Sequence, residues 1–155
     1  MSQSPTEIIK LHTEELLKLL GVETEVTVTE SEAEDRNYLE VDVKSEEHSA
    51  ELIGHHGNML EALTVVLGMF VPRTEQRYNV ILDINGYRGE RAKYIQEVAD
   101  RACAEALATG RDVVLEPMKP WERRVVHMSV VGRKDIVTES IGMGEERKVA
   151  IKPAA

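Results

Sequence analysis

The segment that most constrains this chain is residues 53–63, IGHHGNMLEAL, in which two glycines three positions apart separate a short apolar stretch from an amphipathic helix. Glycine adopts positive φ without strain and lets another molecule approach the main chain. The N-terminus of the following helix supplies amides and the positive end of its dipole, which favour phosphate. The segment therefore predicts a nucleic-acid backbone clamp, or otherwise an ordinary turn between helices, formed by Gly54, His55, His56, Gly57 and Asn58.

The hydrophobic periodicity of the first 85 residues predicts the element order αββααβ. Ser4 and Glu7 form a capping box that opens the first helix, and the acidic stretch 30–36 is expected to be a solvated turn between two strands. In the helix after the glycine loop, Phe70 is expected on the buried face with three leucines. The predicted elements are a helix over 5–20, strands near 26–28 and 39–43, a short helix from 49, a helix that ends before Pro72 and a strand over 78–84.

The dipeptide Asn85-Gly86 is typical of a turn and predicts a boundary between two modules, 1–85 and 86–155. The second module reads as αβαββ, with two helices and three short strands. Its predicted elements are a long helix to about 109, a strand over 113–115, a helix opened by Pro120 and strands near 135–140 and 147–152. The single cysteine, Cys103, falls at an apolar helix position and is expected in the core of a protein from a reducing compartment.

Charge separates the two halves of the chain. The net charge of the whole chain is −9. Residues 1–85 hold 6 Lys and Arg against 17 Asp and Glu, whereas residues 86–155 hold 13 against 11. Aromatic residues are scarce at 4%, so base stacking is not expected to be the main source of binding energy. If the chain binds nucleic acid, the second half is electrostatically better suited to it.

The second half carries a longer signature that supports the nucleic-acid interpretation. Arg123 and His127 form an R-x-x-x-H motif within EPMKPWERRVVH, and VTESIG at 137–142 followed by Arg147 extends it. This pattern resembles the R-x-x-x-H (R-3-H) single-stranded nucleic-acid-binding domain. A KH module, whose G-x-x-G loop clamps nucleotides, followed by such a domain resembles the bacterial Jag (KhpB, SpoIIIJ-associated) family over nearly the whole chain.

The resemblance implies an α+β fold of two small domains: a type II KH domain over 1–85, and an R-x-x-x-H domain over 86–155 with helices packed on a three-stranded sheet. It also implies a cytoplasmic protein that binds single-stranded RNA, with single-stranded DNA as the alternative. Such a protein acts as a post-transcriptional regulator or RNA chaperone linked to cell division and elongation. A small KH-only protein is the expected partner, and no cofactor is expected.

Arg123 and His127 lie four residues apart and are expected to share a solvent-facing helix side that presents a notch for phosphate. The alternative is an ion-pairing arginine and a histidine that satisfies the core. The expected nucleic-acid-binding residues of this module are Lys119, Arg123, Arg124, His127, Thr138, Ser140, Gly142 and Arg147, with 138–142 treated as a loop.

Two departures from the family pattern bear on function. The family prefers basic residues between the two glycines, where this chain has His55 and His56. Histidine titrates close to neutral pH, so the loop is expected either to bind more strongly as the pH falls toward 6 or to contribute only neutral hydrogen bonds. The family's usual N-terminal domain and linker are not in this sequence, which puts any membrane or envelope association that rests on that segment in doubt.

Two other classes of function compete with nucleic-acid binding. Catalysis is not expected, because the sequence lacks HExxH, a nucleophile elbow and CxxC, and no metal site is expected. No apolar run approaches a membrane span. The stronger alternative is a protein-interaction scaffold with an acidic KH-like face and little affinity for nucleic acid.

Overall fold

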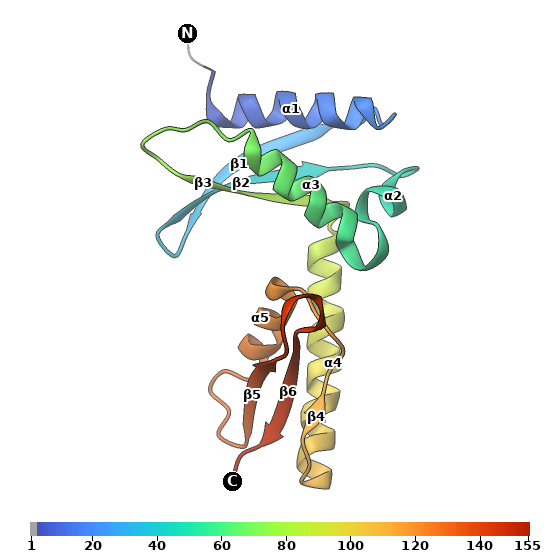
Figure 1. Cartoon of the computed structure of the whole chain (residues 1–155), viewed down its shortest axis with the longest axis vertical. Coiled ribbons are helices and arrows are strands. Elements are labelled where there is room, and N and C mark those ends of the chain that lie inside the picture. Colours follow the sequence, from blue (N-terminus) through green and yellow to red (C-terminus); the bar gives the residue numbers. More distant parts are fainter. Residues whose placement is uncertain (1–2) are drawn as a thin grey trace. The chain divides into compact units, whose positions relative to one another are not determined.

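The computed structural model describes residues 3–155. The chain divides after Arg88 into two compact units, which are described separately here as unit 1 and unit 2 (Figure 1). The helix α4 begins two residues before this division, at Tyr87.

Unit 1 has the predicted order αββααβ, with one added 3-10 turn at the glycine loop. Ser4 caps the first helix, and the reciprocal hydrogen bonds between Ser4 and Glu7 complete the predicted capping box. The elements are α1 Pro5–Leu19, β1 Val26–Ala33, β2 Arg36–Val43, α2 Ser49–Ile53, η1 His55–Gly57, α3 Asn58–Met69 and β3 Tyr78–Ile84.

The sheet of unit 1 has the order β1-β2-β3. β2 pairs antiparallel with β1 and parallel with β3, with Val43 opposite both Val26 and Ile84. Alternate strand residues, including Leu39 and Leu82, share one core with buried leucines of α1 and α3. The helices therefore cover one face of the sheet and hold the glycine loop at the end of α2.

Unit 2 has the predicted order αβαββ, with a 3-10 turn before the last strand. Its sheet has the order β4-β6-β5, and both pairs are antiparallel. One core joins α4, α5 and the sheet and contains Cys103, which is buried as expected. The elements are α4 Tyr87–Thr109, β4 Val113–Val114, α5 Pro120–Ser129, β5 Ile136–Ile141, η2 Gly144–Glu146 and β6 Lys148–Pro153.

The predicted α+β class and the order of elements in both halves are confirmed, but two local predictions are wrong. The stretch 30–36 is mostly strand, because every residue from Val26 to Ala33 pairs across to β2 and only Glu34 and Asp35 remain as the turn. Phe70 is 41% exposed instead of buried; it lies at the C-terminal end of α3 and stacks on His12 with a centroid distance of 4.3 Å. Periodicity alone therefore predicts neither how far an exposed hairpin extends nor whether a residue at the end of a helix is buried.

Between residues 3 and 155, no helix combines the length and the apolar character that crossing a membrane requires.

Candidate nucleic-acid interface

The glycine loop lies between α2 and α3, and both of its glycines have positive φ, +73° at Gly54 and +75° at Gly57. A Cβ at Gly54 would lie 2.7 Å from the Met59 Cβ, a distance that real Cβ atoms essentially never show. A Cβ at Gly57 would lie 3.3 Å from the Tyr87 ring. Both positions therefore favour glycine for its conformation, and Gly54 also needs it for space.

The residues between and after the glycines point outward. His55, His56 and Asn58 are exposed, and the two imidazole rings meet edge to face at a centroid distance of 4.0 Å. His56 itself has a positive φ of 52°, a conformation in which His, Asn and Asp are enriched. The N-cap residue of α3 is Gly57, which has no side chain that could cap the helix, and this helix end lies beside two exposed rings.

Tyr87 was not foreseen as part of this loop, although its ring lies beside Gly57. The tripeptide Asn85-Gly86-Tyr87 would have indicated this position, because a turn after β3 brings the following residue back to the core of unit 1. Asn85 fixes that turn: its amide group bonds the backbone N–H and C=O of Ser45 at 2.9 and 2.6 Å. Tyr87 therefore packs against the core of unit 1 with its ring beside Gly57.

The second predicted site gathers side chains from α5, β5 and the turn before β6. Arg124 is exposed, whereas Arg123 and His127 are half-buried. The expectation that both Arg123 and His127 face solvent is therefore wrong. The Arg123 Nε is buried and has no hydrogen-bond partner among residues 3–155. Helix α5 packs against β5 near His127, whose ring contacts Thr138 and Ser140 of that strand.

His127 is held by two hydroxyl groups. Its Nδ1 lies 2.7 Å from Thr138 Oγ1 and its Nε2 lies 2.8 Å from Ser140 Oγ. A neutral imidazole donates from one nitrogen and accepts at the other, and a hydroxyl serves either role. Desolvation lowers the pKa of His127, and the positive charges of Arg123 and Arg147 lower it further. The ring is therefore neutral near pH 7 and positions α5 on β5.

The segment 138–142 is not a loop as expected, because β5 continues to Ile141. Thr138 and Ser140 are two residues apart on β5, so both side chains lie on the same face of the strand, toward α5, and reach the same ring. Gly142 follows the strand with φ +88°, and a Cβ there would lie 3.0 Å from the Glu146 carbonyl oxygen. Arg147 Nη1 donates to the Gly142 carbonyl at 2.7 Å, so this turn holds Arg147 near His127.

Lys119 is the N-cap residue of α5 and is half-buried. Its backbone N–H donates to Glu122 Oε2 at 2.9 Å, and the other oxygen of Glu122 accepts from Arg91 Nε at 2.8 Å. The Glu122 side chain is only 4% exposed. The sequence analysis did not predict the Arg91–Glu122 ion pair. Because 31 residues separate its two members, no local spacing in the sequence indicates it.

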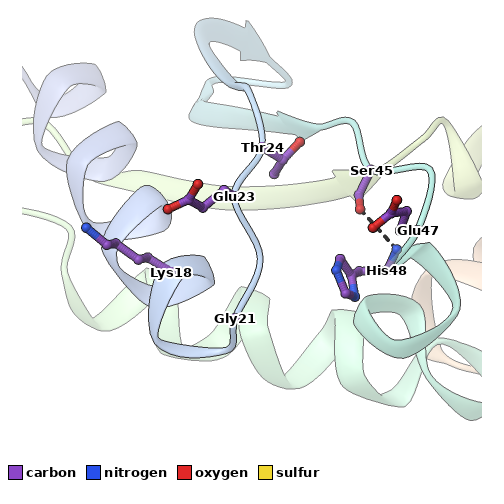
Figure 2. A pocket seen from close by; sticks show the side chains of 7 residues that line it. All are labelled: Lys18, Gly21, Glu23, Thr24, Ser45, Glu47 and His48. Carbon is purple, nitrogen blue, oxygen red and sulfur yellow. Dashed lines mark hydrogen bonds between the residues drawn. The ribbon is translucent and has the colours of Figure 1, made fainter.

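Unit 1 has a shallow hollow whose lining residues belong to neither predicted site (Figure 2). There the backbone N–H of His48 donates to Ser45 Oγ at 3.2 Å, and His48 Nδ1 lies 3.5 Å from Glu51. Its lining combines acidic and basic side chains: Lys18, Gly21, Glu23, Thr24, Ser45, Glu47 and His48. The described residues contain no group of three or more His, Cys, Asp or Glu side chains that could hold a metal ion.

Comparison with known proteins agrees with the two units. The KH domain of KhpA/KhpB matches residues 12–82, and the R-3-H domain matches residues 93–153. Three relatives carry the name RNA-binding protein KhpB. The Bacillus subtilis protein is 30% identical over 150 residues, which are 95% of this chain and 70% of that protein. The match to the Clostridium symbiosum protein is 30% over 139 residues, 89% of this chain and 61% of the relative.

The third relative, from Lactiplantibacillus plantarum, is 32% identical over 101 residues, 64% of this chain and only 31% of its own length. This chain thus matches less than two thirds of the Lactiplantibacillus and Clostridium proteins. The molecule is a tandem of a KH domain and an R-3-H domain. The chain belongs to the KhpB family, as the resemblance indicated.

Proposed function

We propose that this protein binds single-stranded RNA through both domains, with the glycine loop and the α5–β5 site each contacting the phosphate backbone. The observation that carries the proposal is the convergence of Arg123 and Arg147 on His127, whose pKa the positive charges of both lower. Two guanidinium groups beside one neutral ring favour a bound anion. The names of the relatives support RNA as that ligand.

The roles differ among the proposed contact residues. Gly54 and Gly57 let the phosphate approach the backbone amides of the loop and of Asn58. The exposed side chains of His55 and His56 contact the same phosphate. In the R-3-H domain, Lys119, Arg123, Arg124 and Arg147 supply positive charge. Thr138, Ser140 and His127 hold the site in shape, while each hydroxyl keeps hydrogen-bonding capacity for an RNA oxygen. Gly142 lets Arg147 approach.

We also propose that residues 1–85 and 86–155 act as two modules. The contacts of Tyr87 with Gly57, and of Arg88 Nε with the Leu82 carbonyl at 2.8 Å, favour extending the first module to residue 88. Two weak sites on one chain raise the effective concentration of each for the same strand. The cytoplasm is the compartment this function requires.

The wider role is proposed from the family resemblance: a post-transcriptional regulator or RNA chaperone linked to cell division and elongation. A small KH-only protein is the proposed partner. Exposed apolar side chains on α1 and α3 support a protein contact on unit 1, since Leu19 is 85% and Met69 75% exposed. Met69→Glu is expected to abolish capture of such a partner and to leave RNA affinity unchanged.

Fluorescence anisotropy with a labelled RNA oligonucleotide tests the proposed function. We expect the full chain to bind the single strand and to lose affinity when the same RNA is annealed into a duplex, because the loop clamps an unpaired backbone. Equal affinity for both forms would contradict single-strand recognition. Failure to bind either form would favour the protein-interaction scaffold.

A further inference from the structure

Tyr94 on α4 is a surface aromatic residue that the proposed function does not use. Its ring side chain is 52% exposed in a chain that has only one Trp, one Phe and four Tyr. Other aromatic residues are engaged: Tyr78 donates to Glu30 at 2.8 Å, and Phe70 stacks on His12. Tyr94 therefore offers unit 2 an aromatic side chain that is more than half exposed.

Arg91 stands over this ring, one helical turn earlier on α4. The Arg91 Cζ lies 5.2 Å from the Tyr94 ring centroid, within the range of a cation–π contact. The same guanidinium is fixed by its 2.8 Å bond to the buried Glu122 carboxylate. Ring and guanidinium are therefore a pre-organised pair, and little conformational entropy remains to be lost when a ligand stacks on them.

Glu122, which binds the Arg91 guanidinium, directly precedes Arg123 of the proposed phosphate site in the sequence. Glu122 holds Arg91 and also accepts from the Lys119 backbone, and the following residue of α5 is Arg123. Glu122 therefore links α4 to the first turn of α5, on which Arg123 also lies. The pair and the phosphate site both belong to unit 2, so the R-3-H domain alone contains a place for phosphate and a place for a flat ring.

We propose that Tyr94 and Arg91 form a platform on which one unpaired nucleobase stacks while Arg123 binds a phosphate of the same strand; this inference rests on the proposed function. Every base offers a π-face, so the platform selects unpaired bases and not a particular sequence. Bases inside a duplex are already stacked on their neighbours, so the platform discriminates against duplex RNA. One stacked base is compatible with the scarcity of aromatic residues in the chain.

The test compares Tyr94→Leu, which removes the π-face, with Tyr94→Phe, which keeps it, in the full chain. Leu107→Ala, an exposed apolar substitution on the same helix, is the matched control. Affinity for a short single-stranded RNA is measured by anisotropy, and melting by circular dichroism confirms that each variant folds. We expect Tyr94→Leu to weaken binding about tenfold, with Tyr94→Phe and Leu107→Ala close to the unsubstituted protein. Irradiation of a 5-iodouridine oligonucleotide should crosslink to Tyr94.

The outcomes separate the platform from the proposed function. Unchanged affinity of Tyr94→Leu, with Arg123→Ala still weakened, would overturn the platform and leave RNA binding intact. A Tyr94→Phe variant as weak as Tyr94→Leu would also overturn it, because the hydroxyl and not the ring face would then make the contact. If the unsubstituted chain does not bind single strands at all, the proposed function fails first.

Discussion

The two proposed contact regions achieve similar chemistry by opposite means. The loop at 54–57 relies on main-chain geometry: two positive-φ glycines, tight approaches to Met59 and Tyr87, and exposed rings in a module of net charge −11. The α5–β5 site relies on side chains, with Arg123, His127 and Arg147 brought together from separate elements of a module of net charge +2. The comparison suggests that an acidic module would have to contact phosphate through backbone amides, whereas a cationic site needs a network that holds its side chains together.

The largest expected effect concerns that supporting network. Glu122→Ala removes a nearly buried carboxylate from Arg91 and from the Lys119 amide, and breaking a buried ion pair costs about 3 kcal/mol. Amide hydrogen exchange should show faster opening of α4, α5 and β5, with α1 to β3 unaffected. Glu97→Ala, at an exposed position of α4, is the control. Equal loss of protection in unit 1 would contradict two independently stabilised units.

The next effect concerns binding at the side-chain site. Arg123→Ala should weaken single-stranded RNA binding by about 2 kcal/mol, the range for hydrogen bonds to a charged group. Arg123→Lys keeps the charge but loses the planar fork, and should be intermediate. Anisotropy and melting are measured on the same preparations. A lower melting temperature with unchanged affinity per folded molecule would assign Arg123 to structure alone.

The glycine loop gives a smaller effect, and its best probe is not a glycine. Gly57→Asp would press its side chain on the Tyr87 ring, so lost binding would also follow from a distorted loop. The double substitution His55→Asp with His56→Asp places negative charge at exposed positions, and Asp tolerates the positive φ of His56. We expect affinity to fall about tenfold, about 1.4 kcal/mol.

The uncharged pair His55→Asn with His56→Asn is the matched control for the loop. It has similar size and the same tolerance of positive φ, but adds no charge. Affinity that falls equally for both pairs would indicate direct histidine contacts instead of phosphate repulsion. Unchanged affinity of the Asp pair would remove the loop from the binding surface.

The smallest expected effect is a pH dependence confined to unit 2. His127 is the only histidine of residues 89–155, and burial and two arginines lower its pKa in the folded state. Below about pH 6.5 the unfolded chain therefore binds a proton that the folded unit does not, so stability falls as the pH falls. Hydrogen exchange at pH 7 and 5.5 should show this loss, and His127→Gln should flatten it. A unit that becomes more stable at pH 5.5 would contradict the neutral ring.

Sequence predicted the loop better than the side-chain site for a physical reason. The demand for glycine at positions 54 and 57 is local, so spacing alone revealed it, and the capping box at Ser4 was equally local. The bonds from His127 to Thr138 and Ser140 depend on how α5 meets β5. Periodicity placed both elements correctly but could not show that the hydroxyls face the ring, or that Glu122 is buried under Arg91.

The salt dependence of single-stranded RNA binding tests the central claim most directly. Each phosphate neutralised on a single strand contributes about −0.7 to the slope of log K against log salt. The account predicts a clearly negative slope for the full chain that becomes shallower in Arg123→Ala, because that variant neutralises one phosphate fewer. A slope near zero in the unsubstituted protein, or one that Arg123→Ala leaves unchanged, would contradict backbone binding by the α5–β5 site.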